Sequence, residues 1–303
     1  MKMKVALVQM SGYFDKDKTI EKMIKKVGEA AEKNPDVIVL PEMWNCPYGT
    51  KYFREYGEVE NNSKSIKAMS ELAKKYGVYL FGGTVSELDE DKVYNTCYVF
   101  NRQGEIIGKH RKKHLFDVDI EGRMAFSESD VLSPGDKLTV VDTEFGKIAV
   151  AVCFDIRFVE DFAVLTKKMG ARAFIVPAAF NMTTGPSFWE PIMRGRAIDN
   201  QVYVIACAPA QDSDAPYGAY GHSIIVSPWG EVLEVADLDE TIIYRELDMD
   251  YIDSVRKQIP ILNPTIVWYN WQWNKNKDER NFYYEKAFCT FYGIYYVFWF
   301  NSM

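Results

Sequence analysis

Short apolar runs and stretches of helical periodicity follow one another along most of the chain. Runs rich in β-branched residues predict buried strands, at Lys4–Met10, Asp36–Glu42, Val78–Glu87, Ala173–Pro177 and Tyr203–Ala208. Apolar residues at helical spacing predict helices, at Asp17–Lys33, Ser63–Gly77, Val159–Met169 and Ser187–Asn200. Hairpins are predicted at Val93–Lys112 and Lys137–Cys153, and further sheet-forming segments at His222–Ala236 and Glu240–Leu247.

Hairpins mixed with helices form neither a strict alternation of strand and helix nor an all-β pattern. The order therefore predicts a mixed sheet, or two sheets, with helices on the outer faces. The sequence shows no internal repeat, linker or low-complexity segment before about Asn263. We therefore expect one α/β domain over residues 1–264, which is long enough to bury a core without disulfides or metals.

Residues 265–303 have a different composition. They hold 15 of the 44 aromatic residues and four of the seven tryptophans of the chain. The uncharged stretch AFCTFYGIYYVFWFNSM is shorter than the roughly 20 residues of a membrane span, and it lacks helical or alternating periodicity. We expect this tail to lie outside the folded domain, as a frame shift near Pro264 would produce. A hydrophobic anchor and a docking segment are the alternatives.

Charge and cysteine content narrow the functional classes. A formal net charge of -7 argues against a general nucleic-acid-binding protein, which needs a basic face. The five cysteines are odd in number and none are spaced as Cys-x-x-Cys. A disulfide framework or a zinc site is therefore not expected, and a reducing compartment fits. The N-terminus MKMKVALVQM has too short an apolar stretch for a secretory signal, so a cytoplasmic protein is predicted.

Three segments place a chemically capable residue at the end of an apolar run. VIVLPEMWNCPYG holds Glu42, GKHRKKHLFD holds Lys112 and Lys113, and VAVCFDIRF holds Cys153. Taken singly, a glutamate or a lysine is typical of the surface and a cysteine of the core. Cys153, however, follows its apolar run instead of lying inside it, and charged residues come directly after it.

The order of these residues resembles the Glu–Lys–Cys triad of the carbon–nitrogen hydrolases of the nitrilase superfamily. LPEMW, RKKHLFD and VCFDIRF carry the resemblance, and FSESDVLSPGD, PAAFNMTTGPSFWE, RGRAIDNQVYV and GHSIIVSPWGEVL extend it from Lys4 to about Leu262. It implies a four-layer α-β-β-α sandwich, no metal and no cofactor. It also implies a homodimer that pairs through helices, with Arg157–Met169 at the interface.

The resemblance assigns a role to each matching residue. Cys153 corresponds to the nucleophile, Glu42 to the general base and Lys112 to the catalytic lysine. Lys113 is then a bystander. Glu128, in FSESD, corresponds to a second glutamate that lies beside the triad in relatives.

Physical chemistry is consistent with these roles. A thiol with a pKa of about 8.5 is mostly protonated at neutral pH, so a carboxylate must accept its proton while an ammonium stabilises the thiolate. Attack on an amide carbonyl then creates an oxyanion, which Lys112 and the backbone N–H of Phe154 are placed to hold. Glu42 passes the proton to departing ammonia, and water hydrolyses the thioester with Glu42 acting as base again.

Within the superfamily, WNCPYGTKYF, AFNMTTGP and AIDNQVYV resemble the omega-amidases, which act on 2-oxoglutaramate and 2-oxosuccinamate. Such a small amide needs donors for its far carboxylate, and the candidates are Tyr48, Arg157 and the backbone around Thr183 and Thr184. Arg157 is equally well explained as a structural salt-bridge partner. TTGP predicts a helix start whose amides are open to an anion, or an ordinary N-cap followed by Pro186.

Other functions compete with this one. Deaminated-glutathione amidases and N-carbamoyl amide hydrolases belong to the same enzyme class, and a non-enzymatic binding relative would keep only the fold. The intact triad argues against the last. A cysteine–histidine dyad has three available histidines, His110, His114 and His222, of which His114 is more simply a structural residue of its loop. Three scattered histidines offer no metal-ligand spacing.

Overall fold

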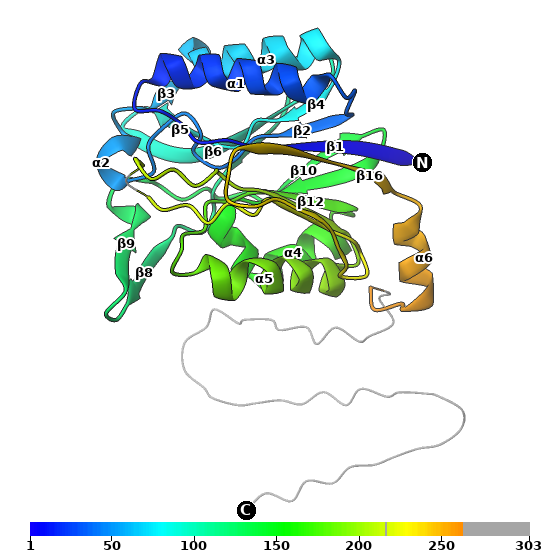
Figure 1. Ribbon diagram of the computed structural model, residues 1–303. Helices are drawn as coiled ribbons and strands as arrows, with labels where there is room; N and C mark the ends of the chain where they lie inside the picture. The colour runs from blue at the N-terminus through cyan, green and yellow to red at the C-terminus, as the bar shows by residue number, and fades with distance from the viewer. Residues whose placement is uncertain (216, 263–303) are drawn as a thin grey trace, which may run out of the picture. The chain divides into compact units, whose positions relative to one another are not determined.

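Two β-sheets face each other, and helices cover their outer sides (Figure 1). The computed structural model describes residues 1–215 and 217–262, so the predictions for residues 265–303 lie outside the described part. Of the two predicted arrangements, two sheets with outer helices are confirmed, as are most of the predicted elements. None of the described helices combines the length and the apolar character that a membrane span requires.

The first sheet has the order β16-β1-β2-β4-β6-β5-β3, and β7 pairs with β6. Its strands are β1 (Lys2–Gln9), β2 (Val37–Val39), β3 (Glu58–Val59), β4 (Tyr79–Phe81), β5 (Val85–Asp89), β6 (Lys92–Phe100), β7 (Ile106–Arg111) and β16 (Thr241–Asp248). Strand β2 runs parallel to β4, which is antiparallel to β6, which is antiparallel to β7. Strands β2 and β7 therefore run in the same direction, and their carboxyl ends meet at one edge of the sheet.

The second sheet has the order β10-β11-β12-β13-β14-β15. Its strands are β10 (Thr139–Thr143), β11 (Gly146–Val150), β12 (Ala173–Pro177), β13 (Tyr203–Cys207), β14 (Ile224–Val226) and β15 (Val232–Val235). A separate hairpin of β8 (Asp117–Ile120) and β9 (Met124–Ser127) extends from the sandwich (Figure 1). Strands β11, β12 and β13 are parallel, so their carboxyl ends also share an edge.

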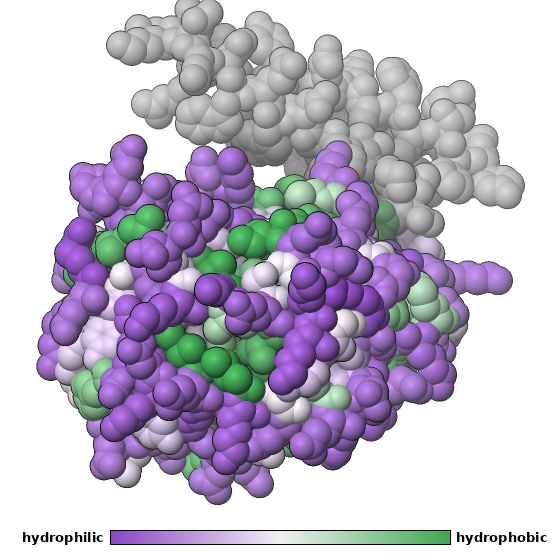
Figure 2. Space-filling view, turned by 90° about the horizontal axis from the view of Figure 1, so that it is seen from above, coloured by the Kyte–Doolittle hydropathy of each residue, from purple (hydrophilic) through white to green (hydrophobic). Residues whose placement is uncertain are grey.

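Side chains of β1 show how four layers arise from strand alternation. Val5 and Leu7 belong to the core between the two sheets, whereas Ala6 and Val8 belong to the core beneath α1 (Lys16–Ala31) and α3 (Lys64–Tyr76). On the other side, α4 (Val159–Lys167) and α5 (Gly185–Asn200) pack against the second sheet. The surface seen from above in Figure 2 is mostly hydrophilic, with hydrophobic residues in limited clusters.

Helix ends follow local signals in the sequence. The side chain of Ser63 accepts a hydrogen bond from the N–H of Ile66 at the start of α3, and Gly77 ends the helix with a left-handed φ of 63°. Serine caps and left-handed glycines are favoured at these two positions. The predicted helix over Ser63–Gly77 is therefore confirmed.

The prediction of one strand over Val78–Glu87 is wrong, because β4 and β5 are separated by a turn. Gly83 in this turn has a φ of 58°, and a Cβ added to it would lie 2.1 Å from the carbonyl oxygen of Pro41. Only glycine fits a left-handed backbone at so close an approach. The sequence did not predict the short helix α2 (Thr50–Phe53), the strands β3, β8 and β9, or the helix α6 (Tyr251–Gln258).

Candidate active site

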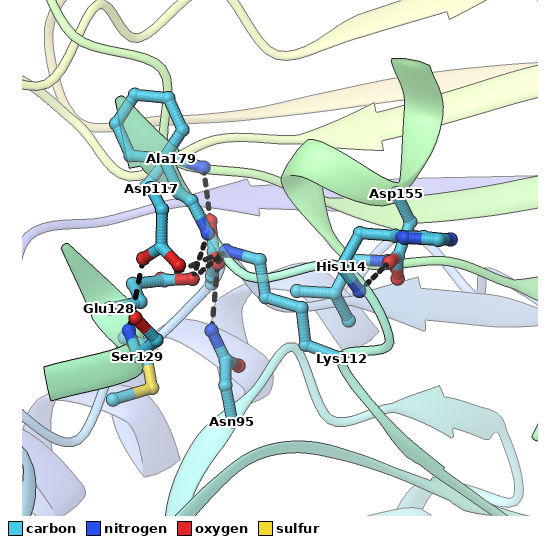
Figure 3. A network of polar contacts seen from close by, with 12 residues as sticks. Asn95, Lys112, His114, Asp117, Glu128, Ser129, Asp155 and Ala179 are labelled. Atoms are coloured by element: carbon cyan, nitrogen blue, oxygen red, sulfur yellow. Dashed lines mark hydrogen bonds and ion pairs between the residues drawn. The ribbon is translucent and has the colours of Figure 1, made fainter. Parts of the chain in front are cut away.

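The carboxyl ends of β2, β7, β11 and β12 bring the site together. Glu42 follows β2, Lys112 follows β7, Cys153 follows β11 and Ala179 follows β12. Lys112 lies between two glutamates, with Nζ 3.0 Å from Oε1 of Glu42 and 2.9 Å from Oε1 of Glu128. Figure 3 shows Lys112 beside Glu128. The side chains of Lys112, Glu42 and Glu128 are all completely buried.

Glu42 is held by donors from two other segments, strand β6 and the loop after β12. Its Oε1 accepts from Nδ2 of Asn95 on β6 at 2.8 Å, and its Oε2 accepts from the backbone N–H of Ala179 at 2.6 Å. Together with Lys112, these donors fix both oxygens of the carboxylate. Charge-assisted bonds of this kind are shorter and stronger than neutral ones.

Glu128 lies in the 3₁₀ helix η2 (Glu128–Asp130) and is held in the same way. Its Oε2 accepts from the backbone N–H of Phe116 at 2.7 Å, and its Oε1 accepts from the hydroxyl of Tyr48 at 2.7 Å. Tyr48 has one hydroxyl proton, and it donates this proton in its hydrogen bond to Glu128. This hydroxyl therefore holds the second glutamate and is not a free donor for a substrate carboxylate.

Cys153 opens the 3₁₀ helix η3 (Cys153–Arg157) with a φ of 46°. This left-handed conformation is uncommon for residues other than glycine and is often found at functional sites. The thiol is buried and borders a small cavity, together with Phe154 and Arg157. The N–H of Phe154 is not bonded to any backbone carbonyl in the described residues, which leaves it available to an oxyanion.

Burial and charge set the resting protonation states. Burial raises the pKa of the Cys153 thiol well above its usual range, and the charge of Glu42 acts in the same direction. Burial also raises the pKa of Glu42, and Lys112 only partly opposes it. Burial alone would lower the pKa of Lys112, but Glu128 and Glu42 outweigh it and leave this pKa well above normal. The thiol therefore stays protonated at rest, next to a carboxylate with an increased proton affinity.

Arg157 lies at this cavity without a carboxylate partner in the described part of the chain. Its Nε is buried and makes no hydrogen bond. Its guanidinium lies 4.7 Å from the ring centre of Phe188, and 5.7 Å from those of Phe154 and Phe180. Burial lowers its pKa from the usual high value. A desolvated cation with an unused donor is suited to binding an anion.

The loop before α5 does not offer open amides, so this expectation was wrong. The backbone N–H groups of Thr183 and Thr184 donate to Oδ1 of Asn181 at 2.9 Å and 3.0 Å. Asn181 thus forms a turn that uses both donors, as asparagine commonly does before helices. Thr184 still lines the cavity beside Cys153, whereas Thr183 lines a wider open groove of about 470 Å³.

The neighbours of Lys112 point away from the thiol. Nζ of Lys113 lies 2.6 Å from Oδ2 of Asp161, and Nε2 of His114 lies 2.8 Å from the same oxygen.

The other two histidines also have partners of their own. His110 contacts Asp155 and Thr139, and Nδ1 of His222 contacts the carbonyl of Tyr220. No histidine in the described residues is hydrogen-bonded to Cys153, which removes the support for a cysteine–histidine dyad.

Sequence reasoning missed Asn95, Ala179 and Tyr217. Tyr217 lines both the cavity and the groove, and its hydroxyl donates to the carbonyl of Ala179 at 2.6 Å. These residues come from elements far apart in the sequence, and no local pattern identifies them. Within the described residues, no group of three or more histidine, cysteine or acidic side chains is arranged to hold a metal ion.

Comparisons with known proteins point to one enzyme family. The carbon-nitrogen hydrolase family matches residues 4–257. Omega-amidase NIT2 of Xenopus tropicalis is 47% identical over 260 residues, which cover 86% of this chain and 94% of that protein. Omega-amidase NIT3 of Saccharomyces cerevisiae is 48% identical over 268 residues, which cover 86% of this chain and 92% of that protein.

Solved structures extend the comparison to the fold. The crystal structure of Saccharomyces cerevisiae Nit3, a member of branch 10 of the nitrilase superfamily, has a TM-score of 0.81 and 43% identity. The aligned region covers 88% of this chain and 97% of the Nit3 chain. The expected sandwich is thereby confirmed, and the chain belongs to the carbon–nitrogen hydrolase family of the nitrilase superfamily.

Proposed function

We propose that this protein is an omega-amidase, which hydrolyses the terminal amide of short 2-oxo dicarboxylate monoamides such as 2-oxoglutaramate and 2-oxosuccinamate. The observation that carries the proposal is the buried Glu42–Lys112 pair beside Cys153, with the unpaired Arg157 in the same cavity. The similarity to proteins named omega-amidases supports the choice of substrate.

The reaction begins with transfer of the thiol proton of Cys153 to Glu42. The sulfur attacks the amide carbon, and the oxyanion that forms is stabilised by Lys112 and the N–H of Phe154. Glu42 returns the proton to the nitrogen, the carbon–nitrogen bond breaks and ammonia leaves. A water molecule then gives its proton to Glu42 and attacks the thioester, which releases the acid and restores the thiol.

Glu128 and Tyr48 support the lysine in this scheme. Two carboxylates around one ammonium raise the pKa of Lys112, so it remains a cation when the thiolate forms. Tyr48 orients Glu128 through a hydrogen bond of 2.7 Å. Charge stabilisation by Lys112 therefore does not require a proton to move to or from the lysine.

Arg157 selects the far end of the substrate. In the described residues it has no acidic partner, which argues against the structural salt bridge that the sequence left open. Its position at the same cavity as Cys153 suits a substrate with an amide at one end and a carboxylate at the other. The cavity of about 10 Å³ has room for roughly one water molecule. The lining side chains must therefore shift when the substrate binds.

A homodimer in the cytoplasm is part of the proposal. Large apolar side chains are exposed on the outer helices, namely Val159 and Val164 on α4 and Phe188 and Ile198 on α5. Pairing of two copies through these helices would remove the apolar side chains from water. The four cysteines of the described residues are free and buried, which fits a reducing compartment. Sedimentation equilibrium of the wild-type chain and of Val164→Glu tests the dimer, because the charge should weaken it.

Ammonia release from a panel of amides tests the activity. We expect 2-oxoglutaramate and 2-oxosuccinamate to be hydrolysed faster than glutamine, and simple nitriles to be left unchanged. Equal or higher rates on deaminated glutathione or on N-carbamoyl compounds would assign the protein to one of those related amidases. No ammonia from any member of the panel would favour the non-enzymatic relative.

A further inference from the structure

Asp155 is a buried carboxylate that the reaction steps above do not use. It is 4% exposed and lies in η3, two residues after Cys153. Its Oδ1 accepts from the backbone N–H of His114 at 2.8 Å. Its Oδ2 accepts from the backbone N–H of Val152 at 2.9 Å and from Nε2 of His110 at 3.1 Å. One carboxylate thus connects three separate points of the chain.

The contact with Val152 encloses the nucleophile. Besides accepting from the N–H of Val152, Asp155 donates its own N–H to the carbonyl of Val152 at 3.0 Å. These two bonds close a ring that contains Cys153 and Phe154. The ring holds Cys153 in its left-handed conformation, and with it the directions of the thiol and of the Phe154 N–H.

The contact with His114 fixes the loop that carries the lysine. His114 is two residues after Lys112, and Figure 3 shows Asp155 beside its backbone N–H. The side chain of His114 points elsewhere, to Asp161, and its ring stacks on that of Phe158 at 3.5 Å. Asp155 therefore links the segment that supplies the ammonium to the segment that supplies the thiol.

His110 orients this carboxylate from the opposite sheet. A carboxylate can only accept, so Nε2 of His110 carries the proton toward Asp155. The other ring nitrogen of His110, on β7, lies 3.1 Å from the hydroxyl of Thr139, on β10. The histidine thus connects the two sheets directly behind Asp155.

We infer that Asp155 is a positioning residue, which sets the placement of Cys153 relative to Lys112 and is itself oriented by His110. The inference deepens the proposed amidase function and rests on it. Its experiment includes alkylation of the Cys153 thiol, a readout that does not depend on any amide substrate.

The test compares the full-length wild-type chain with Asp155→Asn. Asparagine keeps the shape but presents an NH₂ group to one of the two backbone donors, so at least one hydrogen bond is lost. We expect kcat to fall about 100-fold, as small misplacements in active sites do, with KM changed less than about threefold. Alkylation of Cys153 by iodoacetamide, followed by mass spectrometry of its peptide, should become slower and require a higher pH, because a displaced ammonium stabilises the thiolate less.

Asp161→Asn is the matched control, because Asp161 contacts the same loop only through the side chains of Lys113 and His114. It should leave kcat within about threefold of wild type and the alkylation profile unchanged. An Asp155→Asn protein with wild-type kcat and wild-type alkylation would overturn the inference. So would a change in KM alone.

A second pair of variants decides the matter if Asp155→Asn does not fold. His110→Ala should lower kcat about tenfold, and His110→Gln should recover part of the loss because its amide can still donate to Asp155. Wild-type kcat in His110→Ala would overturn the inference. If the wild-type chain releases no ammonia, the proposed function fails separately, and the alkylation profiles of wild type and Asp155→Asn still decide the role of Asp155.

Discussion

The ammonium of Lys112 lies 3.0 Å from Oε1 of Glu42, and both side chains are completely withdrawn from solvent. Glu128 contacts the same ammonium at 2.9 Å. Removing one partner from a buried ion pair leaves an uncompensated charge, which typically costs about 3–5 kcal/mol. The lysine is therefore required for the stability of the site as well as for the reaction.

Lys112→Ala should abolish ammonia release and lower the free energy of unfolding by about 3–5 kcal/mol. Lys113→Ala is the control, because the side chains of Lys113 and Asp161 are 29% and 18% exposed. Its ion pair should contribute about 1 kcal/mol or less, and activity should be retained. Denaturant unfolding and ammonia release measure both effects. Loss of activity in Lys113→Ala but not in Lys112→Ala would show that the two roles are exchanged.

Cys153→Ala should remove all amidase activity while the thermal midpoint stays close to wild type, because only one sulfur is lost. Cys46→Ser, by contrast, should retain activity. Cys46 lies in the loop after β2, where its thiol contacts the carbonyl of Pro47 at 3.2 Å. Full turnover by Cys153→Ala would rule out the nucleophile that we propose.

Glu42→Gln should be as inactive as Cys153→Ala, because an amide cannot accept the thiol proton. In the wild-type enzyme, kcat/KM should fall as the pH drops through the pKa of Glu42. Burial raises this pKa, so the acid limb should lie above the value of about 4.3 for an exposed glutamate. An acid limb at or below that value would show that burial does not raise the pKa of Glu42.

The same raised pKa predicts how Glu42 affects stability. A carboxylate whose folded pKa is raised stabilises the fold in its protonated form, and this contribution is lost as the pH rises from the unfolded to the folded pKa. The stability of wild type relative to Glu42→Gln should therefore fall as the pH rises from about 5 to about 8 in thermal unfolding, with Lys112 still paired to Glu128. A difference that stays constant or grows with pH would show that folding does not raise the pKa of Glu42.

Arg157→Gln should raise KM for 2-oxoglutaramate by about tenfold or more, since a charge-assisted contact contributes about 1.5–3 kcal/mol. Activity on a neutral amide such as propionamide should change little, because that amide has no carboxylate to bind. Arg194→Gln is the control, since Arg194 contacts Gly230 and Glu190 on the outer side of α5. Equal losses on both substrates would mean that Arg157 shapes the cavity and does not select a carboxylate.

A chain that ends at Pro264 should retain activity and become more soluble. Every residue placed in the site lies between Glu42 and Tyr217, and the family match ends at residue 257. Activity and sedimentation of the shortened chain test the expectation. Failure of the shortened chain to fold or to dimerise would show that residues 265–303 are needed for the structure.

Local signals in the sequence predicted those parts of the fold that local physics determines. Gly77 ends α3 because a glycine tolerates the left-handed conformation at a helix end. The break between β4 and β5 has another origin, since it depends on the approach of Gly83 to Pro41, more than 40 residues earlier. The pattern over Val78–Glu87 could not predict this break, because the sequence alone does not show which backbone segment packs against Gly83.

The site divides in the same way. Glu42, Lys112 and Cys153 follow apolar runs in motifs that resemble those of the family, so the sequence could single them out as candidates. Asn95 and Ala179, which hold Glu42, have no such motif, and Ala179 acts only through its backbone N–H. Thr183 and Thr184 were placed correctly beside a helix, but the side chain that occupies their amides becomes evident only from the folded turn.

The arrangement of two buried glutamates around one ammonium also affects product release. Hydrolysis converts the neutral amide into a carboxylate at the same place, next to Glu42 and Glu128. Among the described residues, Lys112 is the one cation in contact with both glutamates. Like charges at short range in a buried site repel strongly. We therefore expect the site to hold the diacid product less tightly than the monoamide from which it came, so that the reaction itself favours product release.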